Sequence, residues 1–132
     1  MDNSFQYLDL LGKEFRYGAR GPEAYDCYGL MIETRRRTGR FIPEEYPSTD
    51  ISEAMHDSIE DAKAYYFELP GPQPFCLVTF KLHPQYTTHI GMVLSDAKRF
   101  IHILPKMRVG IERLDSPVWR HRITGFWETE GS

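Results

Sequence analysis

The sequence has no run of about 18 apolar residues, the length that a helix needs to cross a bilayer, so we expect no membrane insertion. It also lacks the basic start and apolar stretch of a secretory signal peptide, because residues 1–4 read Met-Asp-Asn-Ser. We therefore expect a protein made in the cytoplasm without a signal peptide. If it acts outside the cell, another system has to carry it there.

An excess of positive charge is also absent. The chain has 16 Lys and Arg against 19 Asp and Glu, and its formal net charge is −3. Nucleic-acid binding depends largely on phosphate neutralisation by basic side chains, so we expect no nucleic-acid partner. The one dense basic run, 35–37, is interpreted as the solvated C-terminal end of a helix, where cations suit the helix dipole.

Cysteine is scarce as well. The two cysteines, Cys27 and Cys76, do not make a disulfide framework. No Cys-x-x-Cys or His-x-x-x-His pair of the kind common in zinc sites occurs, so we expect no metal and no cofactor. The 132 residues, 41% of them apolar, fit one folded domain over 1–132.

Helices are expected in the first half of the chain and strands in the second, which predicts an α+β fold with helices packed on an antiparallel sheet of about five strands. The expected helices cover 5–11, Cys27 to about Thr38 behind an N-cap at Asp26, and 51–67 behind a capping box at Asp50 and Glu53. Residues 18–25 are expected to form a loop. The expected strands are 75–82, 89–94, 99–104, 109–113 and 123–127.

Cys27 is the first candidate for chemistry, because the expected helix begins at this residue. The backbone N–H groups of a first helical turn have no intrahelical partner, and the helix dipole adds partial positive charge there. We therefore expect the thiol pKa to lie below its usual value of about 8.5. The same N–H groups could donate to an oxyanion during acyl transfer.

A nucleophilic thiol needs a base, and the base needs an orienting partner. His89 opens one expected strand and His102 lies 13 residues later on the next, so a hairpin could bring the two side by side. Taken singly, a buried cysteine or a strand histidine is more often structural than catalytic. Spacing alone does not decide between these interpretations.

The wider pattern resembles the NlpC-type cell-wall endopeptidases over nearly the whole chain and in the same order. The matching stretches are LGKEFRYG at 11–18, GPEAYDCYGL at 21–30, TGRFIP at 38–43, HIGMVL at 89–94 and FIH at 100–102. They include Asp-Cys-x-Gly-Leu at a helix start and a His-x-Gly strand, the two most specific parts of the family's motif.

This resemblance implies a papain-like fold and a cysteine endopeptidase that cuts peptidoglycan stem peptides, typically next to γ-D-glutamyl. Cys27 would be the nucleophile, His89 the general base and acid, and His102 the orienting residue. Tyr17 matches a family tyrosine whose hydroxyl lies near the nucleophile, although a half-buried loop aromatic is an equally good interpretation. Asp26 and Tyr28 flank the nucleophile, and we count both as candidate substrate-binding residues.

The chain departs from the family pattern in two places. Relatives commonly carry Gly-Asp before the first long strand, whereas residues 73–76 here read Gln-Pro-Phe-Cys. Tyr28 stands where secreted relatives commonly have serine, which resembles the branch found in phage and prophage tails. That branch implies virion-tail localisation and tail-tip proteins as partners.

Two other functions stay open. A structural tail-tip component could keep the fold and bind peptidoglycan or a tail partner without cutting it. Related papain-like enzymes also include amidases and acyltransferases, which would use the same nucleophile and base on another amide substrate.

Overall fold

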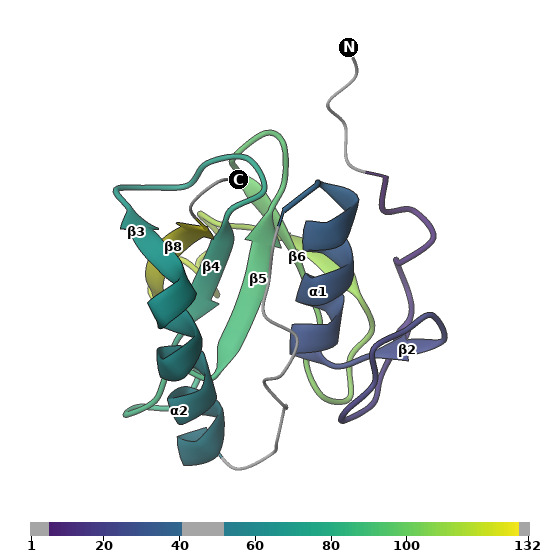
Figure 1. Ribbon diagram of the computed structural model, residues 1–132, viewed down its shortest axis with the longest axis horizontal. Coiled ribbons are helices and arrows are strands. Elements are labelled where there is room, and N and C mark those ends of the chain that lie inside the picture. The colour runs from purple at the N-terminus through teal and green to yellow at the C-terminus, as the bar shows by residue number, and fades with distance from the viewer. Residues whose placement is uncertain (1–5, 41–51, 130–132) are drawn as a thin grey trace.

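The computed structural model describes residues 6–40 and 52–129. In this part of the chain, two α-helices lie on one side of a six-stranded antiparallel sheet, which confirms the α+β prediction (Figure 1). The helices are α1 (Cys27–Arg37) and α2 (Ser52–Ala62), and α2 continues as a 3-10 turn, Lys63–Tyr65. The sheet strands are β3 (Tyr66–Leu69), β4 (Leu77–Phe80), β5 (His89–Val93), β6 (Arg99–His102), β7 (Gly110–Arg113) and β8 (Ile123–Thr129).

Helix α1 begins and ends as its sequence predicts. The Asp26 side chain accepts a hydrogen bond from the backbone N–H of Gly29, which caps the first turn. Gly39 follows the last turn with a φ of 74°, a left-handed conformation that glycine adopts without strain. Leu30 and Met31 are both fully buried and belong to the core cluster between this helix and the sheet.

The order of the six strands is β3-β8-β4-β5-β6-β7, and alternate residues of the central strands face opposite sides. On the helix side, Met92 and Ile101 join a cluster that includes the inner face of α1. On the other side, Val93 and Phe100 join a second cluster that is closed by Trp119. Two very short parallel strands, β1 (Glu14–Phe15) and β2 (Ala24–Tyr25), lie outside the main sheet.

Two predicted helices are wrong in extent. The helix predicted over 5–11 is absent from its described part, 6–11, where residues 8–11 form turns. Only Leu10 of this stretch is fully buried, so too few side chains contact the core to stabilise so short a helix. The helix predicted over 51–67 ends at Ala62, and Tyr66–Leu69 becomes the edge strand β3 because it pairs with β8. The capping residue Asp50 lies outside the described residues.

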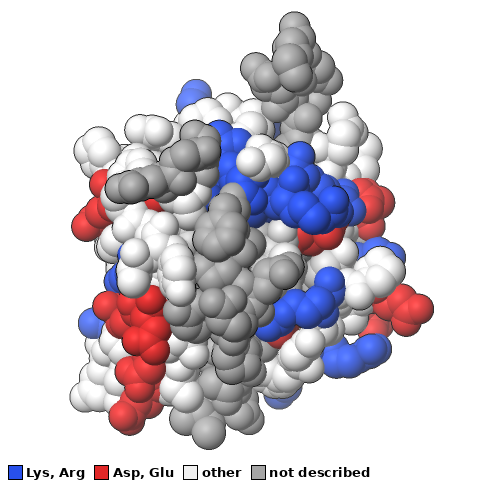
Figure 2. All heavy atoms as spheres, viewed as in Figure 1, with Lys and Arg blue, Asp and Glu red and all other residues white. Residues whose placement is uncertain are grey.

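Charge is unevenly distributed on the helical face of the molecule. Acidic side chains run along α2, and basic side chains gather over α1 (Figure 2). The prediction that residues 35–37 are solvated is wrong for Arg35, which is fully buried, whereas Arg36 is exposed. None of the helices in the described part of the chain is both long and apolar enough to span a bilayer.

Candidate active site

The structure brings His89 and His102 into direct contact. The Nε2 atom of His89 lies 2.8 Å from the Nδ1 atom of His102, and both side chains are buried. The contact follows from the antiparallel pairing of β5 with β6, in which Met92 is opposite Ile101. The predicted proximity of the two histidines is therefore confirmed, while their catalytic roles remain predictions.

Gly91 gives the two imidazoles the room that they need. It lies on the same side of β5 as His89, between this histidine and β6. A Cβ atom at Gly91 would come within 2.9 Å of Cδ2 of Phe100 and 3.1 Å of the carbonyl oxygen of Ile101. The His-x-Gly motif thus needs glycine for a steric reason in this fold: without a side chain at Gly91, nothing separates His89 from His102.

Glu112 is a member of the site that sequence reasoning missed. Its Oε2 atom lies 3.4 Å from Nε2 of His102, so the described structure has a chain of contacts from Glu112 through His102 to His89. The register of β6 and β7 places Gly110 opposite His102, and Glu112 is two residues further on the same face. The sequence offered one signal for this contact: an acidic residue, Glu112, on the predicted strand 109–113 that follows the strand of His102.

Aromatic side chains enclose the histidine pair on the side of the sheet away from the helices. The ring of Trp119 lies 5.0 Å from that of His102 and 6.0 Å from that of His89, measured between centroids. Phe80 packs on His89, and Phe100 packs on His102. Trp119 comes from the connection between β7 and β8, and no local pattern in the sequence indicated that it covers the histidines.

This enclosure keeps both imidazoles neutral at pH 7. Burial lowers the pKa of His89 well below its usual value, and a charge on His102 would lower it further. Burial also lowers the pKa of His102, although the Glu112 carboxylate acts in the opposite direction. A neutral imidazole has one nitrogen that donates and one that accepts, so each histidine has a definite tautomer.

Cys27 occupies the predicted position, the first residue of α1, but its thiol is not activated in this structure. The side chain is 6% exposed, and burial together with the nearby Asp26 carboxylate raises the thiol pKa to about 12. The backbone N–H of Tyr28 and the Arg20 guanidinium lower the pKa by less. The expected fall in the pKa of Cys27 is therefore wrong, because desolvation outweighs the effect of the helix start.

Cys27 and the histidines are near the same end of the fold without a hydrogen bond between them. Helix α1 packs against β5, and both begin at the lower end of the view in Figure 1. Cys27 belongs to the cluster on the helix side, whereas the histidine rings pack with the cluster on the other side. The Nδ1 atom of His89 is buried and has no hydrogen-bond partner in the described structure.

Asp26 holds the start of α1 to the loop that precedes it. Its buried carboxylate accepts from the backbone N–H groups of Gly18 and Gly29 and forms an ion pair with Arg20, with a nitrogen–oxygen distance of 2.6 Å. Gly29 permits this packing, because a Cβ atom there would lie only 2.3 Å from the carbonyl oxygen of Ala19. These contacts give Asp26 a structural role, and its substrate-binding role remains a prediction.

The other two predicted residues, Tyr17 and Tyr28, face different surroundings. Tyr17 is half exposed, meets the edge of the Phe15 ring and lines a surface cavity of about 330 Å³ formed by residues 16–24. Tyr28 is buried and lines a small apolar cavity between α1, α2 and β5, together with Met55 and Ile90. Tyr17 is thus placed to reach a ligand from the surface, whereas Tyr28 packs the core.

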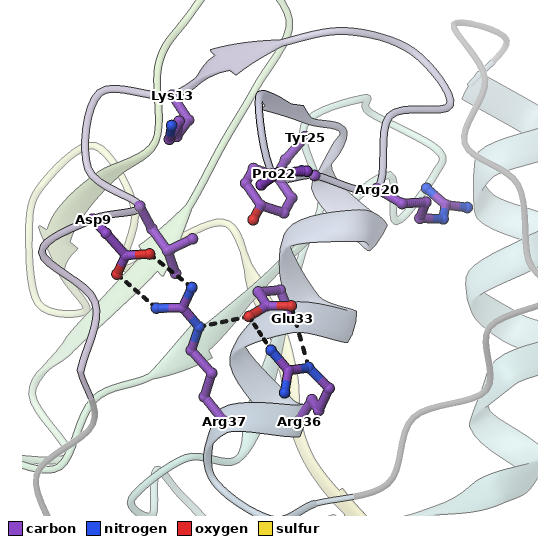
Figure 3. A pocket seen from close by; sticks show the side chains of 10 residues that line it. Asp9, Lys13, Arg20, Pro22, Tyr25, Glu33, Arg36 and Arg37 are labelled. Atoms are coloured by element: carbon purple, nitrogen blue, oxygen red, sulfur yellow. Dashed lines mark hydrogen bonds and ion pairs between the residues drawn. The ribbon is translucent and has the colours of Figure 1, made fainter.

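A larger cavity, of about 360 Å³, lies beside α1 on the side of the N-terminal segment (Figure 3). Arg37 spans it by pairing with both Asp9 and Glu33, and Arg36 pairs with the same glutamate. The hydroxyl group of Tyr25 points into the space between these ion pairs. Cationic side chains outnumber carboxylates on its wall, and none of the predicted site residues lines it.

No group of three His, Cys, Asp or Glu side chains in the described residues is arranged to hold a metal ion. The reactive groups described at the site are a thiol, two neutral imidazoles and a carboxylate.

Comparison with known proteins gives the site a family context. The profile of the NlpC/P60 family matches residues 12–128. No curated protein matches the sequence. Among solved structures, an NLP/P60-family protein similar to lipoprotein from Staphylococcus aureus shares 20% identity over 95% of this chain and 39% of its own, with a TM-score of 0.65.

Two further structures show the same fold. NlpC1 from Trichomonas vaginalis is 21% identical over 91% of this chain and 41% of its own, with a TM-score of 0.65. An NlpC/P60 family protein from Bacillus cereus is 19% identical over 89% of this chain and 35% of its own, with a TM-score of 0.61. The chain thus spans about two fifths of the length of the solved structures that it resembles.

Proposed function

Because the chain belongs to the NlpC/P60 family, we propose that it is a cysteine endopeptidase that hydrolyses amide bonds in peptidoglycan stem peptides. Proteins of this family are typically cysteine peptidases of the cell wall. The observation that carries the proposal is the pair of histidines 2.8 Å apart, in which the buried Nδ1 atom of His89 has no partner. An unpartnered imidazole nitrogen at the end of the sheet where α1 begins is suited to take a proton.

The reaction starts from neutral groups. As Sγ of Cys27 attacks the carbonyl carbon of the scissile amide, the thiol proton passes to Nδ1 of His89. The imidazolium then gives this proton to the leaving amine, and the acyl group remains on Sγ as a thioester. A water molecule attacks the thioester while His89 takes one of its protons, and the thiol is restored as the acid product leaves. This cycle requires Cys27 and His89 to come into contact when substrate binds, since catalytic hydrogen bonds often form only in the complex.

The start of α1 supplies donors for the oxyanion. The backbone N–H groups of Tyr28 and Cys27 both act to lower the pKa of the thiol, so they are available to a negative charge that develops there. The Asp26 side chain occupies the N–H of Gly29, so it does not compete for these two groups. Donors fixed in this way stabilise the tetrahedral intermediate because they do not have to reorganise during the reaction.

Two further parts of the proposal, the position of the cleaved bond and the biological setting, rest on the resemblance of the sequence to the NlpC-type endopeptidases. Cleavage next to γ-D-glutamyl is supported by the Asp-Cys-x-Gly-Leu and His-x-Gly motifs. A phage or prophage tail setting, with tail-tip partners, is supported by the aromatic residue Tyr28. The same residue packs the core between α1 and α2, so its size also has a structural use. Detection of the protein in purified phage particles would support the tail setting, and its absence from them would count against it.

The test is digestion of purified peptidoglycan by the wild-type protein and by Cys27→Ala, followed by mass spectrometry of the fragments. Cys76→Ala is the matched control, because Cys76 is also buried and directly precedes β4. We expect Cys27→Ala to abolish cleavage and Cys76→Ala to retain it, with circular dichroism showing that both variants fold. Full activity of Cys27→Ala would exclude the proposed mechanism.

A second candidate function is binding without cleavage. The observation in its favour is the protonated, buried thiol of Cys27, which has no hydrogen bond to His89. In the same experiment, a binding domain would sediment with peptidoglycan and release no fragments from any variant. Release of products from a different amide substrate would instead indicate an amidase or acyltransferase.

A further inference from the structure

We propose that Glu112 is a positioning residue that sets the tautomers of both histidines and thereby makes Nδ1 of His89 the basic nitrogen of the site. The catalytic consequence rests on the function proposed above. The tautomers themselves are a property of the folded protein and can be measured without any activity.

The first step concerns Glu112 and His102. A carboxylate oxygen can only accept a hydrogen bond, so the contact of 3.4 Å between Oε2 of Glu112 and Nε2 of His102 requires the hydrogen to be on this nitrogen. The second nitrogen of the neutral His102, Nδ1, therefore carries a lone pair. It can accept a hydrogen bond and cannot donate one.

The second step passes this constraint to His89. Because Nδ1 of His102 is an acceptor, the atom 2.8 Å away, Nε2 of His89, has to carry the hydrogen. The remaining nitrogen of His89, Nδ1, is then left with its lone pair. This is the buried atom that has no hydrogen-bond partner in the described structure, which is the state that a general base needs.

Of the groups described around His89 and His102, Glu112 decides between the two tautomeric arrangements. Phe80 and Phe100 pack on the imidazoles with apolar rings, and neither offers an acceptor. In the reversed arrangement, His102 would donate from Nδ1 to Nε2 of His89, and Nδ1 of His89 would carry the hydrogen. That arrangement leaves Nε2 of His102 as an acceptor facing a carboxylate, with no hydrogen between them.

The experiment records long-range ¹H–¹⁵N spectra of the imidazoles of the full chain at neutral pH, where each nitrogen shows whether it is protonated. Glu112→Leu removes the acceptor, and Glu112→Gln keeps an oxygen that can accept. Glu112 lies on the edge strand β7 and its side chain is 36% exposed, so we expect the variants to fold. Glu68→Leu, at an exposed position of the other edge strand β3, is the matched control.

We expect the wild-type protein, Glu112→Gln and Glu68→Leu to show protonated Nε2 and bare Nδ1 atoms on both histidines. Glu112→Leu should populate the reversed arrangement, and its kcat should fall by about tenfold or more with little change in KM, since an incorrect tautomer removes the base. A wild-type spectrum with hydrogen on Nδ1 of His89, or identical spectra for wild type and Glu112→Leu, would overturn the proposal.

The spectra are also recorded in the Cys27→Ala background, which needs no catalysis. Tautomers that follow Glu112, combined with no peptidoglycan cleavage by the wild-type protein, would reject the proposed peptidase function and leave the positioning role intact. Cleavage by the wild-type protein, combined with tautomers that do not change in Glu112→Leu, would reject the positioning role and leave the peptidase function intact.

Discussion

A Cβ atom added to Gly91 would lie 3.5 Å from the Cβ atom of His102, so these residues face each other across β5 and β6. His89 is two residues before Gly91 on the same strand and face, and it reaches His102 diagonally across the hairpin. The contact between the two imidazoles therefore depends on the missing side chain as much as on the histidines.

Replacing this glycine tests that dependence. We expect Gly91→Ala to lower the free energy of unfolding by about 1–3 kcal/mol, because its methyl group would overlap Phe100 and the backbone of Ile101. It should also reduce peptidoglycan cleavage by displacing His102. Urea denaturation and the fragment assay measure the two effects. Gly71→Ala is the control, since a Cβ atom there meets nothing within 4 Å, and equal stability of both variants would contradict the steric explanation.

Two adjacent arginines should differ widely in their effect on stability. Arg35 is fully buried, donates to the carbonyl oxygen of Phe75 and pairs with Glu128 at 2.5 Å. Burial raises the pKa of Glu128, but the hydrogen bond from Arg35, the backbone N–H of Thr129 and the charges of Arg35 and Arg40 together hold this pKa below its usual value. We expect Arg35→Met to cost about 3–5 kcal/mol, because it leaves a largely buried carboxylate without its main partner.

The neighbouring variant Arg36→Met provides the comparison. The Arg36 side chain is 69% exposed and pairs with Glu33 on the surface of α1, so its loss should cost about 0–1 kcal/mol. Urea denaturation of the two variants gives both values. Similar losses would show that burial does not set the strength of these ion pairs.

The thiol of Cys27 should react slowly at neutral pH. With a pKa of about 12, its thiolate fraction rises about tenfold for each pH unit between 7 and 10, and the rate of alkylation by iodoacetamide should follow it. The rate is measured in Cys76→Ala, which leaves Cys27 as the single thiol. A rate that levels off near pH 8 would show that the thiol is activated in solution.

Stability should decline on mild acidification. The pKa of His89 in the folded state lies well below the usual value of about 6.5, so below this pH the unfolded chain binds a proton that the folded state does not. The contribution of the neutral His89 to the free energy of unfolding is fully present above about pH 6.5. As the pH drops below this value, the contribution falls by up to about 1.4 kcal/mol per pH unit. Urea denaturation between pH 7.5 and 5 measures this slope.

His89→Gln should make that slope shallower, with the remainder coming from the buried His102. His83→Gln is the control, because the His83 ring packs on Tyr86 and not on the enclosed pair. An unfolding free energy that does not depend on pH over this range would show that the histidines are accessible to protons in the folded state.

The sequence by itself determined the local structure around each predicted site residue. Asp26 followed by Cys27 indicated a capped helix start, and the structure has that cap. The β-branched and aromatic residues of 75–82 indicated a strand, and the structure has β4 there, with Leu77 and Val78 on opposite faces. The position of His102 13 residues after His89 indicated a hairpin that pairs them. These features depend on neighbours in the chain, so a single sequence contains them.

Only the tertiary structure decided what surrounds these residues. Trp119 covers the histidines, Glu112 contacts His102 and Arg35 is buried, because segments distant in the chain pack there. The same packing reversed the expected pKa shift of Cys27: the helix start favours a thiolate, but burial among residues from other elements costs more. Desolvation depends on the whole arrangement of the chain, and no motif around the cysteine contains that information.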